Sequence, residues 1–177
     1  SALTGAEDTV TLKLNNAQVN QVRVEENNAI PTTGFESFLL KSEGAANSVT
    51  TLFAEDVKSL KIEGDKDLNL GGTTAVHGAQ GVEATHYIAG LGHVAGSLTE
   101  VNAEQIEGKL SYTIGDEINA GLDDTSGVAV NLKVTGGKSD DTFRLAPGAR
   151  IESGDAITGG EGVNTLFHFG GTSKIEG

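Results

Sequence analysis

Two glycine doublets mark the residues of this sequence whose types and spacing could bind a metal ion. Gly136-Gly137 is followed by Asp140-Asp141, and Gly159-Gly160 is followed by Gly162 and Asn164. Both segments match in part a nonapeptide, G-G-x-G-x-D-x-U-x, in which U is a large apolar residue. Glycine-rich turns expose backbone carbonyls beside a carboxylate, and Ca²⁺ takes about six to eight oxygen ligands of this kind. The spacing therefore predicts calcium binding in turns between short strands.

The nine-residue step extends beyond the doublets. Asp155 stands nine residues before Asn164, and Ile157 and Ile175 stand nine residues before and after Leu166. We therefore expect Ile157, Leu166 and Ile175 to occupy three successive rungs of one inward-facing row. The candidate calcium ligands are Gly136, Asp140, Asp141, Asp155, Gly159, Gly162 and Asn164, together with Asp65 and Asp67 further upstream. The alternative for each Asp is a plain turn residue that hydrogen-bonds to backbone.

A second set of turn motifs lies between residues 34 and 72. It comprises Gly34-Phe35-Glu36, Ser42-Glu43-Gly44-Ala45-Ala46-Asn47 and Gly64-Asp65-Lys66-Asp67-Leu68. These motifs resemble the β-solenoid repeat of type I-secreted bacterial surface-layer (S-layer) proteins, and the C-terminal third resembles RTX calcium-binding repeats. The resemblance covers most of residues 34–72 and 128–169, and more loosely residues 1–24. It departs from the nonapeptide at Ser139 and Asn164, which replace a glycine and an Asp.

The resemblance implies an all-β protein, a β-solenoid or β-roll of short strands with little helix. It implies a solenoid region over residues 1–133 and an RTX-like calcium-binding region over residues 134–177, or one continuous domain. The implied function is that of a structural segment of a secreted, calcium-dependent S-layer protein that assembles into a lattice on the bacterial cell surface. Expected partners are neighbouring subunits and, through a region outside this chain, a cell-surface polysaccharide. The alternative is a non-catalytic calcium-binding module, or the solenoid, of a secreted RTX-type enzyme or adhesin.

Alternation of apolar and polar residues predicts many short strands joined by tight turns. The usage of 25 glycines but only 2 prolines agrees with this organisation. Inward-facing side chains are expected to include Leu60, Ile62, Leu132, Val134, Ile157 and Leu166. One stretch, Leu98 to Ile106, is also compatible with a short helix, because Leu98, Val101 and Gln105 suit one or two helical turns.

Composition argues against several classes of function. There are 12 Lys and Arg against 25 Asp and Glu, a net charge of −13, which disfavours binding to nucleic acid or to an anionic membrane. The chain contains no cysteine and no apolar run long enough for a membrane helix, so we expect neither disulfides nor membrane insertion. It also lacks a G-x-S-x-G motif, a phosphate-binding loop and an H-E-x-x-H motif. We therefore expect no catalytic residues.

Overall fold

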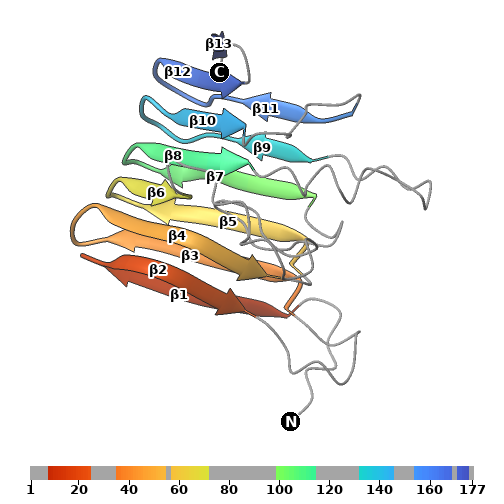
Figure 1. The fold of residues 1–177 in the computed structure, drawn as a ribbon. Helices are drawn as coiled ribbons and strands as arrows, with labels where there is room; N and C mark the ends of the chain where they lie inside the picture. The colour runs from red at the N-terminus through yellow and green to blue at the C-terminus, as the bar shows by residue number, and fades with distance from the viewer. Residues whose placement is uncertain are drawn as a thin grey trace, which may run out of the picture.

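The protein is a stack of β-strands in two sheets (Figure 1). The computed structural model describes residues 8–24, 35–54, 57–71, 99–114, 132–145, 154–168 and 171–175. Every regular element in these ranges is a strand, which confirms the all-β class and the solenoid arrangement. The same ranges contain no helix long and apolar enough to cross a membrane.

The strands alternate between the two sheets along the chain. The first sheet contains, in spatial order, β1 (Thr9–Asn15), β3 (Ser37–Glu43), β5 (Ser59–Gly64), β7 (Glu100–Ile106), β9 (Lys133–Thr135) and β11 (Ala156–Thr158). The second contains β2 (Gln18–Val24), β4 (Asn47–Ala54), β6 (Leu68–Leu70), β8 (Leu110–Ile114), β10 (Thr142–Leu145) and β12 (Asn164–His168). All these neighbours pair in parallel, and β13 (Gly171–Ile175) adds to β12 as an antiparallel strand.

Each odd-numbered strand from β1 to β11 leads through a turn into the next even-numbered strand. We call such a pair with its turn a rung, so that the described strands form six rungs. The six turns lie together along one side of the stack, which we call the turn edge (Figure 1). Because the strands pair in register, residues at the same place in successive rungs form columns that run along the solenoid axis.

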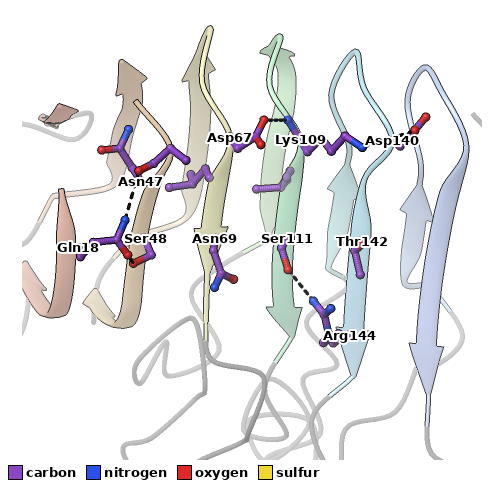
Figure 2. Close-up of a pocket in the computed structure, with 13 residues that line it drawn as sticks. Gln18, Asn47, Ser48, Asp67, Asn69, Lys109, Ser111, Asp140, Thr142 and Arg144 are labelled. Carbon is purple, nitrogen blue, oxygen red and sulfur yellow. Dashed lines mark hydrogen bonds and ion pairs between the residues drawn. The ribbon is translucent and has the colours of Figure 1, made fainter. Parts of the chain in front are cut away.

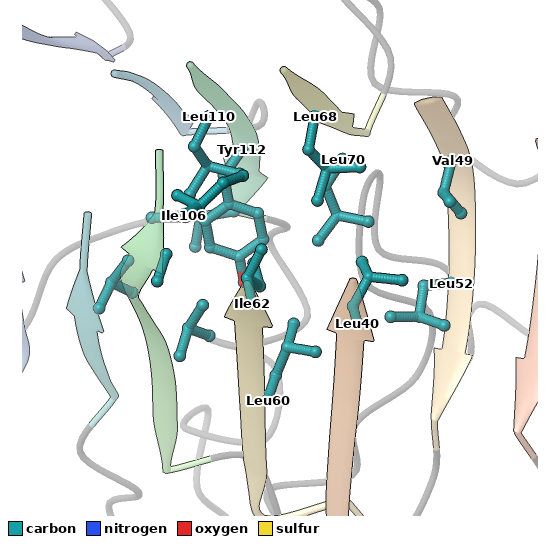
Figure 3. Packing of buried hydrophobic residues seen from close by; sticks show 14 of the residues in the cluster. Leu40, Val49, Leu52, Leu60, Ile62, Leu68, Leu70, Ile106, Leu110 and Tyr112 are labelled. Atoms are coloured by element: carbon teal, nitrogen blue, oxygen red, sulfur yellow. The ribbon is translucent and has the colours of Figure 1, made fainter. Parts of the chain in front are cut away.

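Apolar columns from both sheets form the core (Figure 3). One column of the first sheet contains Val10, Phe38, Leu60, Val101, Val134 and Ile157. The facing column of the second sheet contains Val19, Val49, Leu70, Tyr112, Phe143 and Leu166. The six inward residues expected from the sequence all belong to this core, although Ile157 is only partly buried. Period-2 alternation therefore identified the inward face correctly.

Two local predictions were wrong. Residues 100–106 form β7 and no helix, because Val101, Ala103 and Ile106 are all buried against the core while β7 pairs with β5 and β9. An irregularity in the pairing of β7 with β5 disturbs strict alternation there. The proposed row of three rungs also fails: Ile157 and Leu166 lie in opposite sheets of one rung, and Ile175 lies in the antiparallel β13.

The solenoid continues without a break in pairing across residues 133 and 134, where the two expected regions meet. This point lies inside β9, which pairs with β7 on one side and β11 on the other.

Candidate functional site

The turn edge brings together most of the residues that the sequence marks as calcium ligands. Asp141 and Asn164 occupy the same column, one rung apart, at the point where each turn enters the second sheet. Both are almost completely buried, with 1% of each residue exposed. The column begins at Ala17 and passes through Asn47, Leu68 and Leu110 before it reaches Asp141.

Asn164 joins its own turn to the rung before it. Its side-chain oxygen Oδ1 accepts the backbone N–H of Asp141 at 2.9 Å. Its amide nitrogen Nδ2 donates to the carbonyls of Glu161, at 3.1 Å, and of Gly160 and Gly162, at 3.5 Å each. The carbonyls that a cation would need in this turn therefore already face the hydrogens of an amide.

Asp141 occupies the position that corresponds to Asn164 in the preceding rung, but its side chain is a carboxyl group. Oδ1 accepts the backbone N–H of Leu110 at 2.8 Å, and Oδ2 accepts that of Gly137 at 2.6 Å. Burial raises the pKa of this carboxyl group, while the two backbone N–H donors act in the opposite direction. Both oxygens are thus engaged by the protein itself.

Asn47 makes the same kinds of contact as Asn164, four rungs earlier in the stack. The predicted metal ligands did not include Asn47. Its Oδ1 accepts the N–H of Ala17 at 2.7 Å, and its Nδ2 donates to the carbonyls of Glu43 and Ala45 and to the hydroxyl of Ser42. Ser42 in turn donates to the carbonyl of Asp67 at 3.1 Å. The signal in the sequence was the Ser42–Asn47 motif, whose last residue is an Asn directly before an apolar strand.

Asp155 does not join Asp141 and Asn164. It precedes β11, so the length of that strand separates it from the turn edge. Its Oδ1 accepts the N–H of Leu132, one rung earlier, at 2.9 Å. Glu36 makes the equivalent contact at the second rung, where Oε2 accepts the N–H of Asp8 at 2.8 Å. Side-chain oxygens thus connect rungs at both ends of the strands.

The remaining acidic candidates are exposed on the turn edge. Asp65 pairs with Lys66, Oδ2 to Nζ at 2.7 Å, and this contact lowers the pKa of Asp65. Asp67 accepts the backbone N–H of Lys109 at 2.9 Å. Asp140 accepts the N–H of Val163 at 2.9 Å, and its other oxygen lies 3.8 Å from the Lys109 ammonium.

The candidate glycines let the turns stack directly on one another. A Cβ on Gly136 would lie 2.0 Å from the carbonyl oxygen of Gly159, and one on Gly159 would lie 2.4 Å from the amide nitrogen of Asn164. Gly162 has a φ of +82°, a conformation in which a side chain is strained, and a Cβ on it would lie 2.7 Å from the backbone carbonyl of Ser139. Glycine at these positions is explained by the close approach of backbone to backbone.

The side-chain oxygens of Asp141 and Asn164 are engaged within the protein in the described geometry. They accept backbone hydrogen bonds, whereas calcium takes several oxygen ligands at once. Among the described residues, no three His, Cys, Asp or Glu side chains converge as a metal-binding group. Calcium binding by this chain stays a prediction.

A second candidate site is a polar groove on the outer face of the second sheet. It has a volume of about 440 Å³ and crosses β2, β4, β6, β8 and β10. One polar side chain from each strand lies in a row across it (Figure 2): Gln18, Ser48, Asn69, Ser111 and Thr142. Asp67, Lys109 and Asp140 line the groove on the side of the turn edge, and Arg144 lines the opposite side.

Comparison with known proteins assigns no relative to this chain. No family model, no curated protein sequence and no solved structure matches it. The class that the structure defines is a parallel two-sheet β-solenoid whose rungs are connected through Asn, Asp and Glu side chains.

Proposed function

We propose that this chain is a structural segment of a secreted bacterial cell-surface layer, in which solenoids assemble through protein–protein contacts. The resemblance of residues 34–72 and 128–169 to S-layer and RTX repeats motivates the proposal. The stacked rungs support it, because a repetitive scaffold of this kind offers extended surfaces and open ends for assembly. The observation that carries it is the incomplete burial of the apolar side chains in the first rung, together with the unpaired edges of its two strands.

In the described part of the chain, the apolar side chains of the first rung are less buried than those of the second. Val10 and Leu12 of β1 are only partly buried, whereas their neighbours in β3, Phe38 and Leu40, are each 1% exposed. The second sheet repeats this difference between rungs, since Val19 and Val22 are partly buried while Val49 and Leu52 are 1% exposed. Another rung placed on this end would complete the burial of these side chains.

The backbone at this end is also available for pairing. Among the described strands, β1 and β2 are the end members of the two sheets, so each has an unpaired edge. Such edges are templates for pairing with another chain. At the other end, β13 covers the edge of β12 as an antiparallel strand, whereas β11 is the end member of the first sheet. Among the described strands, the first rung is therefore the only end at which both sheets have an unpaired edge, and we expect association there.

Sedimentation velocity over a series of protein concentrations tests this proposal. The protein should associate as its concentration rises. Replacing Thr9 and Thr11, two exposed residues of β1, by Lys should weaken association, because charged side chains on an edge strand disfavour pairing. Asn102→Lys, on the inner strand β7, is the matched control and should associate like the wild type. A protein that stays monomeric at all concentrations would contradict the proposal.

A further inference from the structure

The row across the outer face of the second sheet consists entirely of uncharged hydrogen-bonding side chains. Register places Gln18, Ser48, Asn69, Ser111 and Thr142 in one column, which Thr165 continues on β12. Neighbouring strands are about 4.8 Å apart, so the five groups in the groove span roughly 19 Å. Hydroxyl and amide groups thus recur at a constant spacing along a nearly straight line.

The outer face of the first sheet has a different character. Lys41 and Lys61 both form ion pairs with Glu63 there, at 2.9 and 2.7 Å between nitrogen and oxygen. Lys13 lies 3.9 Å from Glu43. The central column of that face contains Thr11, Leu39, Lys61, Asn102, Thr135 and Thr158, so an apolar and a charged residue interrupt its uncharged polar groups. An uninterrupted row of five uncharged polar groups is found on the second sheet.

Within the groove, two side chains of the row have no hydrogen-bond partner among the described residues. These are Asn69 and Thr142, whereas Ser48 donates to Gln18, and Arg144 donates to Ser111. At the margins, Asp67 accepts the backbone N–H of Lys109, and Asp140 lies 3.8 Å from the Lys109 ammonium. A ligand in the groove therefore meets free uncharged groups in the row and charged groups at its margins.

An aromatic ring lies next to the groove. Phe167 of β12 is 39% exposed, although it is one of the largest apolar side chains in the described part. The guanidinium carbon of Arg144 lies 5.1 Å from the centre of its ring, and the same Arg144 lines the groove. This contact orients the ring beside the polar row, where an apolar face of a ligand could pack on it.

We propose that this groove binds a linear, uncharged polysaccharide that lies across the strands. Such a chain carries hydroxyl groups at a regular repeat, which match the row from Gln18 to Thr142, and apolar ring faces, which match Phe167. A small number of precisely placed polar groups beside an aromatic ring is the usual means of orienting such a ligand. The binding surface belongs to this chain and does not depend on the assembly proposed above.

Two other occupants fit less well. An extended peptide gains its affinity by pairing with a free strand edge, but β4, β6, β8 and β10 have strands paired on both sides. An acidic polysaccharide would meet Lys109 and Arg144, but Asp67 and Asp140 line the same groove, and the net charge of the protein is −13. Repulsion by these carboxylates and by the net charge disfavours an acidic polymer.

Affinity electrophoresis in native gels tests the proposal, with gels that contain dextran, galactomannan, hydroxyethylcellulose or the acidic polymer alginate. We expect at least one neutral polymer to retard the protein. The double variant Asn69→Ala/Thr142→Ala and the single variant Phe167→Ala should each bind roughly tenfold more weakly, as expected for loss of one or two good contacts. The control Asn102→Ala/Thr135→Ala changes the outer face of the first sheet on its inner strands β7 and β9 and should bind like the wild type.

The possible results separate clearly. Retardation by a neutral polymer that is lost in the groove variants and kept in the control would support the site. Retardation by alginate alone, by no polymer, or equally in all variants would overturn it. Circular dichroism spectra of every variant show whether the fold is kept. Sedimentation velocity on the same samples reports the assembly proposal separately, so either proposal can fail alone.

Discussion

The side chain of Asn164 accepts the backbone N–H of Asp141, the residue at the same position of the preceding rung. Asp141 accepts the N–H of Leu110 in the same way, and Asn47 accepts that of Ala17. The side chains of these residues accept hydrogen bonds from buried backbone N–H groups at the point where each turn enters the second sheet. Their main role in the described structure is to connect one rung with the next.

Removing one of these connections should destabilise the fold. Asn47→Ala leaves the N–H of Ala17 and the carbonyl of Ala45 without this side-chain partner, and it removes the amide donor to Ser42 and Glu43. Because an unsatisfied buried polar group costs about 1–3 kcal/mol, we expect urea unfolding to show a loss of at least about 2 kcal/mol. Asn69→Ala is the exposed control and should change stability by less than about 0.5 kcal/mol. Equal stability of the two variants would contradict the role assigned to Asn47.

Asn164→Asp restores the acidic residue of the calcium-binding nonapeptide. In a chelator such as EGTA the variant should melt at a lower temperature than the wild type, because its carboxylate would face the carbonyls of residues 160–162. Added calcium should raise the melting temperature of the variant more than that of the wild type, since a carboxylate beside three carbonyls offers the ligands that the ion prefers. The same wild-type curves test the calcium dependence expected from the sequence. A wild-type response as large as that of the variant would show that Asn164 does not exclude the ion.

Asp141 should make the protein more stable as the pH falls from neutral towards 4. Burial raises its folded-state pKa above the unfolded value, so the folded state binds the proton more tightly. The resulting stabilisation is fully present below the unfolded pKa and is lost as the pH rises through the folded pKa. Urea unfolding of the wild type and Asp141→Asn across this range isolates the contribution, because the other carboxyl groups are common to both. A stability difference that does not change with pH would contradict it.

Tyr112→Phe should leave the protein equally stable or more stable. The Tyr112 hydroxyl is buried in the core and has no hydrogen-bond partner among the described residues, and burial raises the pKa of the group. Removing it relieves an unsatisfied polar group, a gain of up to about 1 kcal/mol in the free energy of unfolding. Phe143 lies next to Tyr112 in the same inward column, so Phe143→Tyr is the matched reverse change and should destabilise. A clear loss of stability in Tyr112→Phe would mean that the hydroxyl has a partner such as buried water.

Local patterns in the sequence determined the strands and the face that each strand buries. Alternation at Leu60 and Ile62, for example, was sufficient to predict that both side chains point inward, and both are 0% exposed. This works because the side-chain period of a strand is a property of the strand alone. It did not work at residues 100–106, where the irregular pairing of β7 with β5 decides which side chains are buried.

Only the tertiary structure decided what the acidic and amide residues of the turns contact. Asn164 and Asp141 are 23 residues apart in the chain, yet stacking places them in one column. The row from Gln18 to Thr142 also exists only through the register of five strands, because the segments between the rungs differ in length. Residue type shows that an oxygen is available. Which N–H, ion or ligand it meets depends on the stacking of rungs, and no single turn contains that information.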